Sequence, residues 1–248
     1  MKVITLNVNG IRSATQKGLL EWLAGQNADV VLLQEVRAHQ HQLPDFSALD
    51  YKTYWFAAQK AGYSGVGVLS KLEPKKVQYG FGSAEFDAEG RVLCLEFDGW
   101  NAISAYFPSG SSNQERQAAK YRFLAEFEPW LLALHGEVLL GGDLNIAHRE
   151  IDLKNWRGNI GSSGFLPEER AWLSGILERG YSDAFRNHIG ETEAYSWWSN
   201  RGRARENNVG WRIDYQLCTA GLAARVTSAS IYRDRFFSDH APVILELA

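Results

Sequence analysis

The chain is poor in cysteine, has no long hydrophobic run and carries no excess of basic charge. Its two cysteines, Cys94 and Cys218, are too few for a disulfide framework. Both fall in strand-like runs, so we expect buried free thiols in a reducing compartment. No apolar stretch has the length of a membrane span, and the first predicted strand follows Met1 too closely for a targeting peptide. These features predict a soluble, cytoplasmic protein without a membrane partner.

The formal net charge is −3, from 26 Lys and Arg against 29 Asp and Glu. This balance excludes a global basic field, so a nucleic-acid partner would need local basic patches. Acidic residues gathered at one site would instead suit a cation. The sequence has no linker, no low-complexity segment and no internal repeat. With 45% hydrophobic residues in a chain of 248, we expect one domain that covers residues 1–248.

Strand-like patterns occur along most of the chain, and helical periodicity occurs in three places. The predicted strands cover residues 2–9, 29–35, 52–57, 65–70, 75–80, 91–97, 101–107, 138–143, 195–198, 211–219, 225–232 and 242–247. The predicted helices begin near Ser13, Asn113 and Pro167, and Pro129 is expected to kink or restart the second one. Two groups of strands with interleaved helices predict a four-layer α/β sandwich, in which helices flank two packed, mainly antiparallel sheets.

Residues 138–148 form the most informative stretch. An apolar run meets two glycines and ends on Asp143 and Asn145, which are two positions apart. Side chains at positions i and i+2 of an extended chain point the same way, so both would emerge together at the carboxyl end of a core strand. For this stretch alone, a turn in which the two side chains only bond nearby backbone is an equally good interpretation.

Other predicted strands and turns also lead into an amide, an acid or a histidine. These residues are Asn7, Asn9, Glu35, Asp214, Asp239 and His240. A site assembled from strand ends has this composition, although each residue taken singly is as easily a capping or turn residue. Oxygen ligands without cysteine suit a hard cation, Mg²⁺ or Mn²⁺, and Glu35 is the best single candidate ligand. Asp214 would fix the tautomer or the charge of His240 if the two side chains meet.

Six motifs span nearly the whole chain. They are residues 7–12 (NVNGIR), 33–35 (LQE), 106–110 (YFPSG), 142–148 (GDLNIAH), 210–215 (GWRIDY) and 238–242 (SDHAP). In this order and spacing they resemble the motifs of the exonuclease III-type apurinic/apyrimidinic (AP) endonucleases, which belong to the endonuclease/exonuclease/phosphatase superfamily. Residues 151–156 and 164–170 resemble the same family. The resemblance implies a DNase I-like sandwich.

The resemblance also implies a role for each matching residue. Glu35 matches the metal ligand, with Asn9 and Asp239 close to the metal. Asp143 matches the residue that positions or deprotonates the attacking water, and Asn145 matches the amide beside it. The Asp214–His240 pair would bond a phosphate oxygen. Tyr106, near the scissile phosphate, and Asn7 complete the catalytic set. The residues that match substrate contacts are Trp197, Trp211 and Ile213 around the base-free sugar, and Ser109 near the phosphate. Further candidate phosphate contacts are Lys60, Lys154, Arg157, Arg201, Arg203 and Arg205.

The implied function is a Mg²⁺-dependent phosphodiesterase of base excision repair, which Mn²⁺ would also support. It would act as a monomer on double-stranded DNA and cut 5′ to an abasic site, and the resemblance leaves room for 3′→5′ exonuclease or 3′-end-cleaning activity. One alternative is a catalytically idle nucleic-acid-binding regulator that resembles the catabolite repression control protein. Its weakness is that a non-enzyme has no need for all the acids and amides together. A phosphatase for lipid or inositol substrates would not explain the tryptophans.

Overall fold

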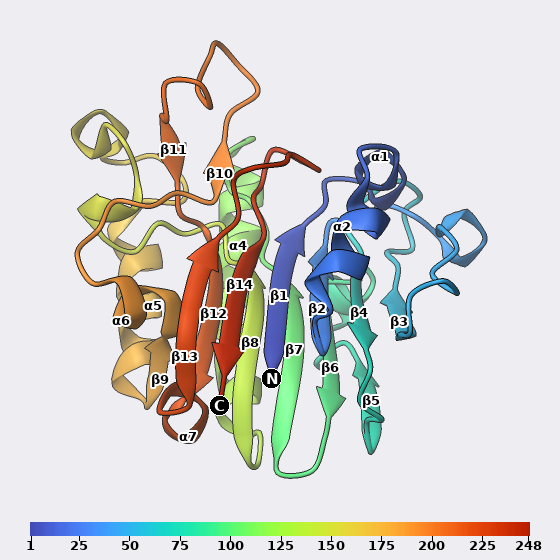
Figure 1. Cartoon of the computed structure of the whole chain (residues 1–248). Helices are drawn as coiled ribbons and strands as arrows, with labels where there is room; N and C mark the ends of the chain where they lie inside the picture. The colour runs from blue at the N-terminus through green and yellow to red at the C-terminus, as the bar shows by residue number, and fades with distance from the viewer.

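The computed structural model describes residues 1–248 and contains two six-stranded β-sheets packed face to face, with helices on both outer faces (Figure 1). In spatial order, the first sheet consists of β13 (Val226–Ile231), β14 (Val243–Leu247), β1 (Lys2–Asn7), β2 (Val30–Gln34), β4 (Val66–Ser70) and β3 (Lys52–Phe56). The second consists of β5 (Lys76–Tyr79), β6 (Val92–Glu96), β7 (Trp100–Tyr106), β8 (Glu137–Asp143), β12 (Asp214–Thr219) and β9 (Tyr181–Asp183). A separate ribbon pairs β10 (Trp197–Trp198) with β11 (Gly210–Trp211).

Only two strand pairs are parallel, β1 with β2 and β7 with β8. The main helices are α1 (Ile11–Gln16) and α2 (Leu19–Gln26) on the first sheet, and α4 (Gln114–Leu132) and α5 (Pro167–Glu178) on the second. The short ones are α3 (Ala84–Asp87), α6 (Ala184–Ile189) and α7 (Ala220–Ala223). None of them combines the length and the apolar character of a membrane-spanning helix. The architecture confirms the predicted four-layer α/β sandwich.

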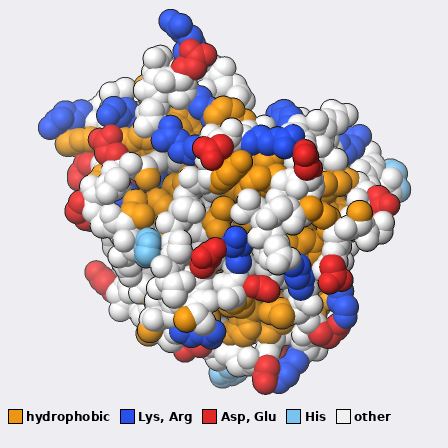
Figure 2. Space-filling view, viewed as in Figure 1, with side chains coloured by type: hydrophobic (Ala, Val, Ile, Leu, Met, Phe, Trp, Pro, Cys, Tyr) orange, Lys and Arg blue, Asp and Glu red, His pale blue; other side chains and the backbone are white.

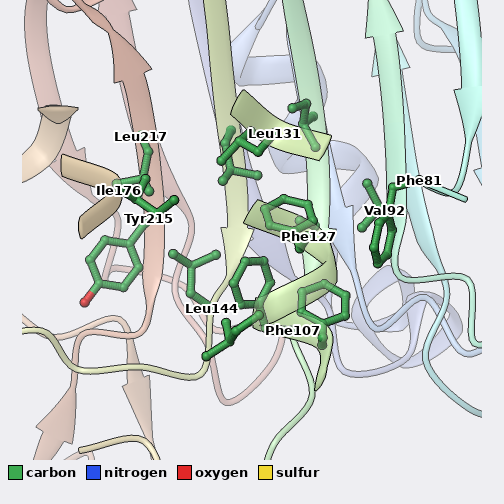
Figure 3. Close-up of a cluster of buried hydrophobic side chains, with 14 of the residues drawn as sticks. Phe81, Val92, Phe107, Phe127, Leu131, Leu144, Ile176, Tyr215 and Leu217 are labelled. Carbon is green, nitrogen blue, oxygen red and sulfur yellow. The ribbon is translucent and has the colours of Figure 1, made fainter. Parts of the chain in front are cut away.

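Three apolar layers hold the sandwich together. Val3 packs between the two sheets, whereas the next residue, Ile4, packs under α1 and α2. Strand β1 is therefore buried on both faces, which explains its continuous apolar character. The third layer joins α4 and α5 to the second sheet, and Figure 3 shows Phe107, Phe127 and other members of this cluster side by side.

Three details of the predicted elements are wrong. Ser13 does not cap the first helix, since α1 begins at Ile11 and α2 restarts after Gly18, whose φ is 89°. Pro129 does not restart α4, because the apolar face of that helix is anchored on the sheet on both sides of the proline. The predicted strand 211–219 is two strands, because Trp211 pairs with Trp197 of the ribbon while Asp214 pairs with Asp143 of the main sheet.

Candidate active site

One edge of the sandwich collects the polar strand ends. Asn7 is the last residue of β1, Tyr106 of β7 and Asp143 of β8, and all three strands run toward this edge. Asp214 lies at the same edge because β12 is antiparallel to β8 and pairs Asp214 with Asp143. The ribbon of β10 and β11 rises above this edge at the top of Figure 1. Strand order, rather than sequence proximity, therefore assembles the site.

Asp143 is the centre of the hydrogen-bond network, and it is 2% exposed. The side-chain amide of Asn7 donates to Oδ2 (2.9 Å), the backbone N–H of Asn145 donates to Oδ1 (2.9 Å), and Nε2 of His240 lies 3.8 Å from Oδ2. Burial raises the pKa of Asp143 to about 7; the positive charge of His240 opposes this shift and the negative charge of Asp214 adds to it. A carboxylate with a pKa near neutrality suits proton transfer at physiological pH.

His240 and Asp214 do meet. Nδ1 of His240 lies 2.9 and 3.1 Å from the two oxygens of Asp214, and the hydroxyl of Ser196 donates to the same carboxylate (2.6 Å). Burial alone would lower the pKa of His240, but the charge and hydrogen bond of Asp214 outweigh it and raise the pKa to about 10. His240 is therefore a cation at neutral pH and can donate from Nε2. Although ligand atoms of Asp143, Asp214 and His240 lie within 4.8 Å of one another, a protonated imidazole has no free lone pair for a metal.

Asn145 adopts a left-handed backbone conformation, with a φ of 52°. Its backbone N–H bonds Asp143, as expected for the turn interpretation, and its side-chain amide donates to the carbonyl oxygen of Phe107 (3.0 Å). Both residues nevertheless line an open cleft. The stretch is thus a turn that also presents an acid and an amide to a ligand.

Two further carboxylates, Glu35 and Asp239, line the same cleft. Glu35 accepts a hydrogen bond from the Tyr106 hydroxyl and pairs with Arg37 (2.8 Å), while Asp239 accepts from the side-chain amide of Asn9 (2.8 Å). Burial opposes ionisation of Asp239, but His240 and its hydrogen-bond donors lower its pKa below the usual value. Two carboxylates and a neighbouring amide oxygen that line one cleft, with no thiolate among the lining residues, fit a hard divalent cation.

The cleft has a volume of about 1040 Å³. The predicted site residues that line it are Asn9, Glu35, Tyr106, Ser109, Asp143, Asn145, Lys154, Trp197, Arg201, Trp211, Ile213, Asp239 and His240. Two further predicted catalytic residues lie behind it, since Asn7 bonds Asp143 and Asp214 bonds His240. The predicted residues make up 13 of the 29 that line the cleft.

The tryptophans form part of that surface. Trp197 and Trp211 face each other across the ribbon, and both pack against a small apolar cluster that contains Ile213 and Phe165. The indole N–H of Trp197 donates to Asp239 (3.1 Å), which links the aromatic wall to the acidic wall. The result is a partly exposed apolar pocket next to the acids.

Some cleft residues were missed and some expected contacts lie elsewhere. The missed residues include Arg37, Gln114, Gln117, Asn155, Asn159, Ser162 and Ser163. Only the last four have a signal in the sequence, because they fall in the segment rich in Asn, Gly and Ser that follows Lys154. Lys60, Arg157 and Arg203 do not line the cleft. Arg205 lies against the rings of Trp198 (4.7 Å) and Phe236 (3.2 Å) and donates to the Ser238 carbonyl oxygen (3.1 Å), so it braces the ribbon.

Comparisons with known proteins agree with this geometry. The Endonuclease/Exonuclease/phosphatase family matches residues 4–240. The chain is 42% identical to an exodeoxyribonuclease of Bacillus subtilis over 99% of this chain and 98% of that one, and 38% identical to the DNA repair nuclease APEX1 of Danio rerio over 100% and 82%. An AP endonuclease structure from Archaeoglobus fulgidus superposes with a TM-score of 0.92 at 26% identity, covering 100% and 99% of the two chains.

The chain belongs to the endonuclease/exonuclease/phosphatase family. It is an enzyme of nuclease type, and its relatives of known name are exodeoxyribonucleases and AP endonucleases of DNA repair. The predicted resemblance to the exonuclease III-type AP endonucleases is therefore confirmed.

Proposed function

We propose that this nuclease hydrolyses the phosphodiester bond 5′ to an abasic site in double-stranded DNA, with a divalent cation, Mg²⁺ or Mn²⁺, as cofactor. The observation that carries the proposal is that Asp143, cationic His240 and Glu35 line one cleft with a tryptophan-lined pocket beside it. A phosphodiester needs a positioned nucleophile on one side and positive charge around its oxygens.

Asp143 accepts a proton from the attacking water and orients it, since Asn7 and the N–H of Asn145 fix the carboxylate in place. His240 donates from Nε2 to a non-bridging phosphate oxygen, and Asp214 keeps it charged and oriented. Glu35 and Asp239, with the amide of Asn9, would hold the cation. That cation supplies positive charge to the phosphate. The water oxygen bonds to phosphorus and the bond to the 3′-oxygen breaks. The 3′-oxygen takes up a proton from solvent water and Asp143 later returns its proton to solvent, so the products are a 3′-hydroxyl and a 5′-deoxyribose phosphate.

Selectivity for abasic sites follows from the pocket. An abasic sugar has no base to unstack or unpair, so its rotation out of the duplex costs little. Trp197, Trp211 and Ile213 line an apolar part of the cleft that would receive a bare sugar and exclude a nucleotide that carries its base. The same cleft is open to a 3′ end, which supports 3′→5′ exonuclease or end-cleaning activity as a secondary reaction in base excision repair.

The proposal includes a single domain over residues 1–248 that acts as a monomer in the cytoplasm. The inter-sheet layer contains residues from both sheets, which supports one folding unit. Both cysteines are buried and unpaired, as expected in a reducing compartment.

The test uses a labelled duplex with one tetrahydrofuran abasic analogue. We expect one nick 5′ to the analogue with Mg²⁺ or Mn²⁺, none with EDTA, and a loss of about 10³-fold in kcat for Asp143→Asn with DNA binding largely retained. Asp98→Asn is the control, because Asp98 is exposed and pairs with Lys75 away from the cleft.

Three results would contradict the proposal. Wild-type turnover by Asp143→Asn would mean that the assigned site is wrong. Tight binding without cleavage in both cations would favour the regulator. Turnover of a soluble phosphoinositide with none on abasic DNA would favour a phosphatase.

A further inference from the structure

Helix α4 contains a lysine that its sequence pattern does not explain. Lys120 lies among the buried residues of the helix and has no exposed surface. Its ammonium donates to one oxygen of Glu169 (2.7 Å), which is also fully buried, and to the backbone carbonyl oxygen of Asn145 (2.7 Å). Lys120 cannot touch DNA from this position, but it contacts a residue of the candidate active site directly.

The contact completes a three-point attachment of Asn145. The backbone N–H donates to Asp143, the side-chain amide donates to the Phe107 carbonyl oxygen, and the carbonyl oxygen accepts from Lys120. Asn145 needs such fixing because its backbone is left-handed, with a φ of 52°. A non-glycine residue adopts this conformation at a cost, so it persists only where its surroundings hold it.

The second oxygen of Glu169 holds a loop that lies against the Asn145 turn. It accepts from the backbone N–H groups of Gly164 (2.7 Å) and Leu166 (3.0 Å), and both residues line the cleft. Gly164 lies against the turn, since a Cβ built there would be 3.1 Å from the Asn145 carbonyl oxygen. The Glu169 carboxylate thus connects the loop that contains Gly164 and Leu166 to the Lys120 ammonium, which in turn holds the Asn145 carbonyl oxygen.

Stability does not account for this arrangement. Removing two charges from water costs several kcal/mol, and well-packed apolar residues of similar volume stabilise a fold equally well or better. An ion pair at this place has one property that an apolar pair lacks: its spare donor and acceptor atoms hold backbone groups in a defined position.

We propose that Lys120 is a positioning residue whose hydrogen bond to the Asn145 carbonyl oxygen fixes the Asn145 turn, and thereby the Asp143 carboxylate, while Glu169 holds the Lys120 ammonium and the loop that contains Gly164 and Leu166. Lys120 and Glu169 act through Asn145 and are not catalytic residues. This inference rests on the proposed function for its kinetic consequence, but its structural consequence is independent of it.

The test compares Lys120→Met, Glu169→Gln and the double variant on the abasic duplex. All three break the ion pair, but only variants without Lys120 release Asn145; the glutamine oxygen can still accept from Gly164 and Leu166. We expect Lys120→Met and the double variant to lose at least about tenfold in kcat with KM within about threefold, and Glu169→Gln to lose clearly less.

Leu131→Ala is the matched control, because Leu131 is a buried residue of the same helix whose side chain lies in the core. It should lower Tm at least as much as Lys120→Met while kcat stays within about twofold. Equal kcat losses in Lys120→Met and Glu169→Gln, or a loss in Leu131→Ala that matches its fall in Tm, would overturn the inference.

A second readout does not depend on activity. Hydrogen–deuterium exchange of the segment 144–148 should accelerate in Lys120→Met relative to wild type and to Leu131→Ala at equal stability. Unchanged exchange would overturn the inference. Faster exchange together with a wild-type enzyme that does not cut abasic DNA would refute the proposed function and leave the positioning role intact.

Discussion

At the residue scale, buried ion pairs hold backbone segments in place near the candidate site. Asp152 is fully buried and accepts from Arg186 (2.5 Å) and Arg212 (2.8 Å), and the guanidinium of Arg212 also pairs with Asp183 (2.8 Å). Arg212 immediately precedes Ile213 and Asp214. Asp152 belongs to the segment 151–156, which carries part of the family resemblance. Its contacts with the two arginines explain why an acid is needed there: Asp152 anchors the segment that joins the ribbon to β12.

Asp152 makes stability depend on pH in a defined window. Burial alone would raise its pKa, but Arg212 and Arg186 outweigh burial and lower the pKa to about 2. Because the folded pKa lies below the ordinary value of 3.8, the stabilisation is present above pH 4 and is lost as pH falls toward 2. The lost contribution is about 2 kcal/mol.

The measurement is the free energy of unfolding of wild type and Asp152→Asn by urea between pH 7 and pH 2. We expect the variant to be less stable at neutral pH, by about 3 kcal/mol or more, because two buried arginines lose their partner. The difference in free energy of unfolding between wild type and variant should narrow as pH falls below 4. A constant difference would mean that the charge of Asp152 is not what stabilises the segment.

At the element scale, β8 is the strand on which the site depends. Its two glycines do not end the strand, which continues through them to Asp143. A Cβ at Gly141 would be 2.4 Å from a methyl of Leu32 in the other sheet, and a Cβ at Gly142 would be 1.9 Å from the Ala105 carbonyl oxygen of β7. The glycines therefore allow close approach on both sides of the strand, which places Asp143 deep in the sandwich.

We predict that Gly142→Ala lowers the free energy of unfolding by about 3 kcal/mol or more, since the clash is with backbone that cannot move aside. Gly25→Ala is the control: Gly25 is exposed in α2, a Cβ there meets nothing within 4 Å, and alanine should stabilise the helix by about 0.5–1 kcal/mol. Denaturant titration of both variants tests this. A Gly142→Ala protein as stable as wild type would show that β7 and β8 can separate without loss.

At the scale of the whole molecule, the charge distribution sets how DNA can be held. The net charge is −3, and the only cationic Lys or Arg residues that line the cleft are Arg37, Lys154 and Arg201. Figure 2 shows many Lys and Arg side chains, with some Asp and Glu among them, along the upper part of the molecule. Attraction to DNA is therefore local to this part of the molecule.

We predict a shallow salt dependence of binding to an abasic duplex, measured with the Asp143→Asn variant. With about three phosphate contacts, log K should fall with log[salt] with a slope of about −2.7, which is roughly 40-fold from about 50 to about 200 mM salt. Arg201→Gln should reduce the slope by about 1, and Lys75→Gln, which lies away from the cleft, should leave it unchanged. A slope near −6 would require a larger basic surface than the cleft provides.

The sequence by itself determined the types of most long elements and selected the candidate residues that the fold brings to one cleft. The strand prediction at 138–143 succeeds because side-chain alternation and apolar runs are local properties of the chain. Polar residues such as Asp143 and Glu35 stand out because they interrupt or follow those runs. The choice of a hard cation follows from the oxygen ligands alone.

Only the tertiary structure decided which of these residues meet. Asn7 and Asp143 are 136 positions apart, and their contact depends on the packing of β1 against β8, which no local pattern encodes. The pKa directions of Asp143 and His240 depend on burial and neighbouring charge, which exist only after folding. In the sequence, Lys120 looks like an ordinary polar residue of a helix, and only the fold shows that it is buried against Asn145. Whether a charged side chain can be buried depends on the partners that the fold provides and not on its own residue type.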